Sequence, residues 1–146
     1  MFERCLYFNI NALARSINQR WEDAYQAVGL SPAHAYLLRV ALSSPGITQK
    51  QLAAELRLAP STITRFIDAL ATRGLLQRQD TRGDGREWAI HPTATARALR
   101  DELERIGTGL FQELRGTLGE VRCTELVDNL RQAHETLHGT RRQKSA

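Results

Sequence analysis

The stretch of residues 48–86 constrains the fold of this 146-residue chain more than any other segment. Two short amphipathic segments are joined by a turn, and a basic segment that contains two glycines follows. In the second amphipathic segment, apolar residues recur at steps of three and four: Ile63, Phe66, Ile67 and Leu70. This is the spacing of one helix face, so these four side chains are expected to face a core. The pattern predicts two packed helices followed by a β-hairpin.

Capping signals mark the ends of the two helices. Thr48 is followed three positions later by Gln51, as in a capping box at a helix start. The chain then turns before Pro60, and the second helix is expected to run to about residue 73. Gly74 is suited to end that helix because glycine readily takes the left-handed conformation.

The segment that follows predicts a hairpin with a short tip. Residues 75–79 and 87–91 are expected to form its two strands, and residues 80–85 its turn. Alternation along the second strand places Trp88 and Ile90 on the inward face. Pro92 should end the strand because proline has no N–H to donate to a ladder.

Long apolar stripes flank this central part. Residues 4–28 predict one helix ended by Gly29, and Ser31 and Pro32 predict the start of the next helix. Further stripes predict helices over residues 93–114 and from residue 121 to a stop at Gly139. A glycine-rich interruption at residues 116–119 separates these last two helices. The fold class expected is mainly α, with a small β-hairpin wing: a winged helix-turn-helix.

Charge distribution favours a polyanionic partner for the central part. The formal net charge of the chain is +4. Residues 48–86 contain seven basic and four acidic side chains, so most of the excess lies there. Nine polar or basic side chains in this part are predicted to contact DNA, on the second helix, on the first turn of the helix before it and on the hairpin: Gln49, Lys50, Ser61, Thr62, Thr64, Arg65, Arg73, Arg82 and Arg86.

The spacing of these residues matches what reading a duplex requires. An α-helix fits the major groove, and hydroxyls and an arginine near its N-terminus can reach base edges and phosphates: here Ser61, Thr62, Thr64 and Arg65. Arginines beside a hairpin tip with no bulky side chains, here Arg82 and Arg86, suit the narrow minor groove. The sequence therefore predicts binding to double-stranded DNA.

At this point the chain closely resembles the MarR family of bacterial transcriptional regulators. The residues that carry the resemblance are those of segments 52–56, 61–70, 73–75 and 80–86. The last segment, from Asp80 to Arg86, matches the family's D-x-R-D-x-R wing with one extra residue. The family usually has Leu-Thr after the wing, and this chain has Pro92 and Thr93. This departure concerns a packing position.

The resemblance implies an intertwined homodimer that recognises a pseudo-palindromic operator, usually as a repressor that a small aromatic or phenolic effector releases. It divides the chain into a dimerisation helix (1–30), a DNA-binding lobe (31–92), C-terminal dimerisation helices (93–140) and a basic disordered tail (141–146). Its effector pocket would lie between the first two helices and the lobe, with Trp21, His34 and Tyr36 as lining.

A second mode of regulation stays open at the cysteines. Some relatives that sense hydroperoxides have a reactive cysteine near the start of the first helix, where Cys5 lies, and some have another near the C-terminal helices, where Cys123 lies. The tyrosines that hold the thiolate in those sensors are not matched in position here. A redox-sensing repressor that uses Cys5 is thus the alternative, against two structural thiols.

Other functions find less support in the sequence. It contains no set of nucleophile, base and acid, no P-loop and no cluster of metal ligands, so no enzyme, cofactor or metal is expected. No signal peptide or membrane-spanning run is found, and a cytoplasmic protein is expected. A winged-helix module that binds protein in place of DNA would not need the arginines at positions 65, 82 and 86.

Overall fold

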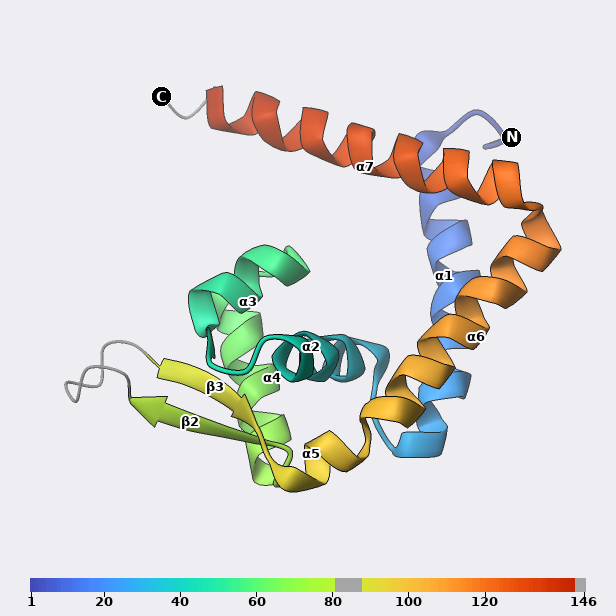
Figure 1. Cartoon of the computed structure of the whole chain (residues 1–146). Helices are drawn as coiled ribbons and strands as arrows, with labels where there is room; N and C mark the ends of the chain where they lie inside the picture. Colours follow the sequence, from blue (N-terminus) through green and yellow to red (C-terminus); the bar gives the residue numbers. More distant parts are fainter. Residues whose placement is uncertain (81–87, 144–146) are drawn as a thin grey trace. The chain divides into compact units, whose positions relative to one another are not determined.

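The computed structural model describes residues 1–80 and 88–143 and divides into two compact units, Met1–Gly107 and Thr108–Ala146. The first unit contains a helical lobe with a three-stranded sheet, and the second begins within helix α6 (Arg100–Leu118) and includes helix α7 (Glu120–Gln143) (Figure 1). Within the described residues, no helix has an apolar stretch long enough to cross a membrane.

The first two helices begin and end where local signals place them. Helix α1 spans Leu6–Tyr25, and its expected last turn is a 3-10 helix, η1, at Gln26–Val28. Gly29 then takes the left-handed conformation (φ 65°), which confirms the predicted stop. Helix α2 spans Pro32–Ser43, and the side chain of Ser31 accepts a hydrogen bond from the backbone N–H of His34. The predicted N-cap is thus confirmed.

The helix-turn-helix follows as predicted. A short strand, β1 (Ile47–Thr48), leads into helix α3 (Gln49–Leu56). The expected capping box, formed by Thr48 and Gln51, is present at the start of α3. Helix α4 spans Pro60–Thr72, and Gly74 beyond it has a φ of 68°. In Figure 1, α3 and α4 lie next to α2, and contacts between these elements join the three helices into one lobe.

The sheet contains one strand more than the sequence predicted. Strands β2 (Leu76–Asp80) and β3 (Trp88–Pro92) form the antiparallel hairpin, and β1 pairs with the other edge of β3, in the order β1-β3-β2. The tip of the hairpin, residues 81–87, lies outside the described residues.

The prediction for Trp88 was wrong. Its side chain is 38% exposed, whereas Ala89 and Ile90 are buried. Trp88 is the first residue of β3 and pairs with Asp80 at the tip end of the hairpin. It lies outside the pairing with β1, which involves Ala89 and Ile90 alone.

The core of the lobe lies between α2, α4 and the sheet. Ile63, Ile67 and Leu70 are fully buried on the inner face of α4, as predicted. Leu37 and Leu38 of α2 are equally buried. Phe66 was expected to join them but is only half-buried, and its ring packs edge-on against the ring of His34, with 4.8 Å between centroids.

The C-terminal helices differ from the prediction at their ends. The expected helix over residues 93–114 is two helices, α5 (Ala94–Ala98) and α6 (Arg100–Leu118), because the N–H of Leu99 bonds to the carbonyl of Ala96, three residues back. Gly119, with a φ of 85°, separates α6 from α7 (Glu120–Gln143). Helix α7 continues past the predicted stop at Gly139, so the first residues of the expected disordered tail, 141–143, are helical.

Candidate nucleic-acid interface

The outer face of α4 is exposed along its length. Four side chains on this face are exposed at steps of three and four: Ser61, Arg65, Asp68 and Thr72. They lie opposite the buried Ile63, Ile67 and Leu70. Thr62, next to Ser61, is half-buried. Burial on one face and exposure on the other fix the rotation of the helix about its axis. The N-terminal half of the outer face therefore presents hydroxyls and a guanidinium to solvent. On α3, Lys50 is also exposed.

Two of the predicted DNA contacts bind each other. Gln49 Nε2 of α3 donates to Thr64 Oγ1 of α4 at 2.5 Å, and Thr64 Oγ1 donates its own hydrogen to the carbonyl of Pro60 at 2.9 Å. The hydroxyl of Thr64 has only one hydrogen, so it has none left for a base or a phosphate. In this structure the hydrogen bond between Gln49 and Thr64 joins α3 to α4.

Arg73 does not belong to the exposed N-terminal half of α4. It lies at the C-terminal end of the helix, and its Nη1 donates to the carbonyl of Gly29 at 2.7 Å. The guanidinium of Arg73 thus binds the C-cap residue of η1, within the same lobe. The DNA contact of Arg73 stays a prediction, and in this structure its Nη1 is directed to another part of the lobe.

The hairpin is tied to α4 by an ion pair that the sequence analysis missed. Arg78 Nη2 of β2 lies 2.6 Å from Asp68 Oδ1 of α4. Both residues were visible as charges, but their pairing depends on how the hairpin folds back over the helix, and sequence spacing does not give that. The predicted wing contacts Arg82 and Arg86 lie outside the described residues.

Two of the three predicted effector-pocket residues come together. Trp21 Nε1 of α1 donates to Tyr36 Oη of α2 at 3.1 Å. The guanidinium of Arg39 lies over the Tyr36 ring, 5.6 Å from its centroid, and binds Glu104 of α6 with both carboxylate oxygens, at 2.8 and 3.2 Å. Tyr36, Arg39 and Glu104 line a cavity of about 420 Å³.

The electrostatics of this cluster reflect burial and the ion pair. The hydrogen bonds from Arg39 lower the pKa of Glu104, and the same interaction raises the pKa of Arg39. Burial raises the pKa of Tyr25, whose ring lies edge-on to Tyr36, and the positive charge of Arg39 opposes part of that rise. Gly107 leaves room for Arg39, because a Cβ there would lie 2.6 Å from Nη1.

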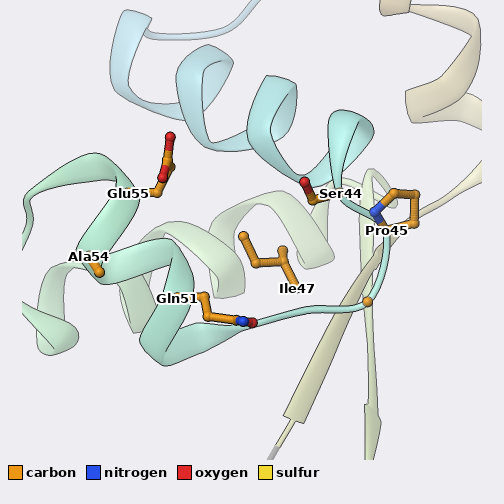
Figure 2. A pocket seen from close by; sticks show the side chains of 7 residues that line it. Ser44, Pro45, Ile47, Gln51, Ala54 and Glu55 are labelled. Carbon is orange, nitrogen blue, oxygen red and sulfur yellow. The ribbon is translucent and has the colours of Figure 1, made fainter.

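A second cavity, of about 600 Å³, adjoins the first and shares Ser44, Ile47 and Glu55 with it. Figure 2 shows Gln51, Ala54 and Glu55 of α3 on one side of it and the end of α2 on the other. Because the two cavities share three residues, they form one groove along α2 and α3, which we call the α2–α3 groove.

His34 lies apart from the α2–α3 groove. Its Nδ1 is 2.9 Å from Ser31 Oγ, and its ring packs on Phe66. Neither His34 nor Trp21 is among the residues that line the α2–α3 groove, whereas Tyr36 is, and the effector-pocket role of His34 stays a prediction. Burial, followed by the positive charge of Arg73, lowers its pKa.

The lowered pKa of His34 predicts a pH-dependent stability. The unfolded chain binds a proton at this residue more readily than the folded chain. The stabilising contribution is therefore complete above about pH 6.5 and is lost as the pH falls through the folded pKa. We expect the Tm of the wild type to fall more steeply between about pH 7 and pH 5 than that of His34→Gln. Thermal denaturation of the wild type and of His34→Gln across this pH range tests the prediction. If the Tm of the two proteins changed with pH in parallel, the prediction would be contradicted.

The two cysteines differ in accessibility. Cys5 is half-buried at the N-cap of α1, and Cys123 is buried on α7; both are free thiols. An oxidant would reach Cys5 more easily than Cys123.

The central part of the chain is similar in sequence to a known protein family. Residues 28–87 match the model of the MarR family. The matched segment contains the helix-turn-helix, the outer face of α4 and the start of the wing. The comparison with curated proteins gave no match.

Solved structures share the fold over most of the chain. The transcriptional regulator MosR of M. tuberculosis is 25% identical, with a TM-score of 0.75 over 93% of this chain and 99% of its own. A complex of S. aureus MepR with DNA is 18% identical, with a TM-score of 0.81 over 92% and 99%. CouR of Rhodococcus jostii RHA1, solved with p-coumaroyl-CoA, is 22% identical, with a TM-score of 0.75 over 90% and 92%.

Proposed function

We propose that this chain, a member of the MarR family, is a dimeric, sequence-specific DNA-binding regulator of transcription that acts as a repressor. The observation that carries the proposal is the outer face of α4, where Ser61 and Arg65 are exposed and Thr62 is half-exposed. The inner face of the same helix is buried in the core of the lobe. The fold is shared with MepR, which has been solved in complex with DNA.

In this proposal α4 enters the major groove. Arg65 can bind a guanine through two hydrogen bonds, while the hydroxyls of Ser61 and Thr62 contact bases or the backbone. Lys50, at the start of α3, is placed to contact a phosphate. Arg82 and Arg86 would extend the contact into the minor groove, where a narrow groove favours arginine.

A second copy of the chain is expected to complete the regulator. Helix α1 has Leu6 and Tyr7 more than two-thirds exposed, and α7 has Val121 and Leu137 equally exposed. Large exposed apolar side chains are typical of surfaces that another chain covers. Two copies would set their α4 helices about one turn of DNA apart, which suits a pseudo-palindromic operator.

Selection from genomic DNA tests the proposed function. Purified protein would be mixed with sheared DNA of its own source at physiological salt, and the retained fragments would be sequenced. We expect repeated recovery of a few fragments that share an inverted repeat. Recovery of fragments in proportion to their abundance would contradict the proposal.

We further propose that a small aromatic effector binds at the Tyr36 end of the α2–α3 groove and releases the DNA. Tyr36 offers an aromatic face there, and Arg39, the cation among the described lining residues, is already paired with Glu104. Glu55 adds a second carboxylate. A neutral phenol should therefore bind better than the same phenol with a carboxylate group.

The expected preference is about fivefold or more, because one unfavourable charge contact near a surface costs about 1 kcal/mol. Trp21 can report binding in a Trp88→Phe variant, which removes the other of the two tryptophans. Ethyl 4-hydroxybenzoate and 4-hydroxybenzoate would be titrated against its emission. Tyr36→Ala should abolish the signal change and the exposed Tyr7→Ala should not; equal titrations in both variants would contradict the site.

Oxidation of Cys5 is a second candidate trigger, favoured by its partial exposure. Treatment with cumene hydroperoxide should then lower DNA affinity in the wild type and not in Cys5→Ser. If both proteins keep their affinity, the effector remains as the proposed trigger.

A further inference from the structure

We infer that Asp68 and Arg78 form a positioning pair that holds the wing hairpin at the angle needed to bind DNA together with α4; this inference rests on the proposed function. The two side chains connect α4 with β2, the two elements that flank Gly74 in the sequence. Asp68 lies on α4, and Arg78 lies in the middle of β2. Their atoms Oδ1 and Nη2 are 2.6 Å apart.

The position of Asp68 is unfavourable for DNA binding unless its charge is compensated. It lies on the exposed outer face of α4, at the next position on that face after Arg65. A carboxylate there would repel the phosphates of a duplex docked on this face. Arg78 brings a positive charge into direct contact with it and removes most of that cost.

The pair contributes little to folding. The side chain of Asp68 is 54% exposed and that of Arg78 is 29% exposed, and ion pairs at this level of exposure rarely add more than about 1 kcal/mol. A structural role alone therefore does not account for a carboxylate on this face. A role in orientation does account for it, because the ion pair adds a polar link between α4 and β2 beyond their buried contact near Leu76.

The sign of one substitution separates positioning from simple electrostatics. Asp68→Asn removes a negative charge from the DNA-facing side, so electrostatics alone would strengthen binding. If the pair positions the hairpin, the same change weakens binding by about fivefold or more, as expected when a contact between two coupled residues is lost. The conservative Asp68→Glu keeps the charge and should retain most of the affinity.

The experiment measures affinity by fluorescence anisotropy for Asp68→Asn, Arg78→Ala and the double variant. The probe is a fragment enriched in the genomic selection, or a random duplex at low salt if no fragment is enriched. Glu102→Gln is the matched control: it removes the same charge and breaks an ion pair with Arg105 that lies on α6, away from the wing. Thermal denaturation of each variant shows whether the fold is kept.

The pair is supported if Asp68→Asn binds more weakly, the double variant binds no more weakly than Arg78→Ala, and the control keeps its affinity. Tighter or unchanged binding by Asp68→Asn would overturn the inference, and so would losses that add in the double variant. Failure of the wild type to bind either probe would instead remove the proposed function itself, so the two failures are distinguishable.

Discussion

Replacing Arg65 with alanine is expected to weaken binding to the enriched operator by about 1–3 kcal/mol, as is usual when one bidentate base contact is lost. Arg65 lies on the exposed face of α4, one turn after Ser61, on the half of the helix that would enter the groove. Binding to random DNA should weaken much less, because a base contact adds specificity beyond the phosphate contacts. Titration of both duplexes by anisotropy measures the two losses.

Arg73→Ala is the matched control for this experiment. It removes the same side chain from the same helix, but from the end where the guanidinium binds the carbonyl of Gly29. We expect Arg73→Ala to lower the Tm and to leave the preference for the operator unchanged. If Arg73→Ala lost the preference while Arg65→Ala retained it, the assignment of the outer face would be incorrect.

Replacing Leu137 with aspartate is expected to break the dimer and to lower operator affinity by about 10²–10⁴-fold, the gain that linking two binding sites usually provides. Leu137 is 68% exposed on α7, so the fold of a single chain does not depend on burying it. A charge buried in an apolar interface between two chains would destabilise the dimer and not the single chain. Sedimentation velocity gives the oligomeric state, and anisotropy gives the affinity.

Gln132→Asp provides the control on the same helix. Gln132 is exposed, and it lies five residues before Leu137, which places it on a different face of α7. This variant should remain dimeric and bind the operator. A monomeric wild type, or a dimeric Leu137→Asp variant with full affinity, would refute the role given to α7.

The helix boundaries of the lobe could be predicted because their signals are local. The capping box of Thr48 and Gln51, the N-cap at Ser31 and the left-handed glycines at positions 29 and 74 each depend on residues within a few positions of one another. The buried face of α4 was equally visible, since three of its four predicted residues repeat at helical spacing and are fully buried.

The features that were missed depend on contacts between distant segments. Strand β1 is only two residues long and exists because β3 offers it an edge. The partners of Gln49, Arg73 and Asp68 lie 15, 44 and 10 positions away along the chain. Polar side chains that bind within the fold look the same in sequence as polar side chains that face a ligand, so these contacts could not be predicted from spacing.

The central claim is that two copies of this chain read a specific duplex through the outer faces of their α4 helices. Competition binding tests it most directly: a labelled operator fragment bound by the wild type is displaced by unlabelled operator or by random duplex of the same length, at physiological salt. The proposal predicts that operator competes at least about 10³-fold better than random DNA. Equal competition by the two duplexes would contradict it.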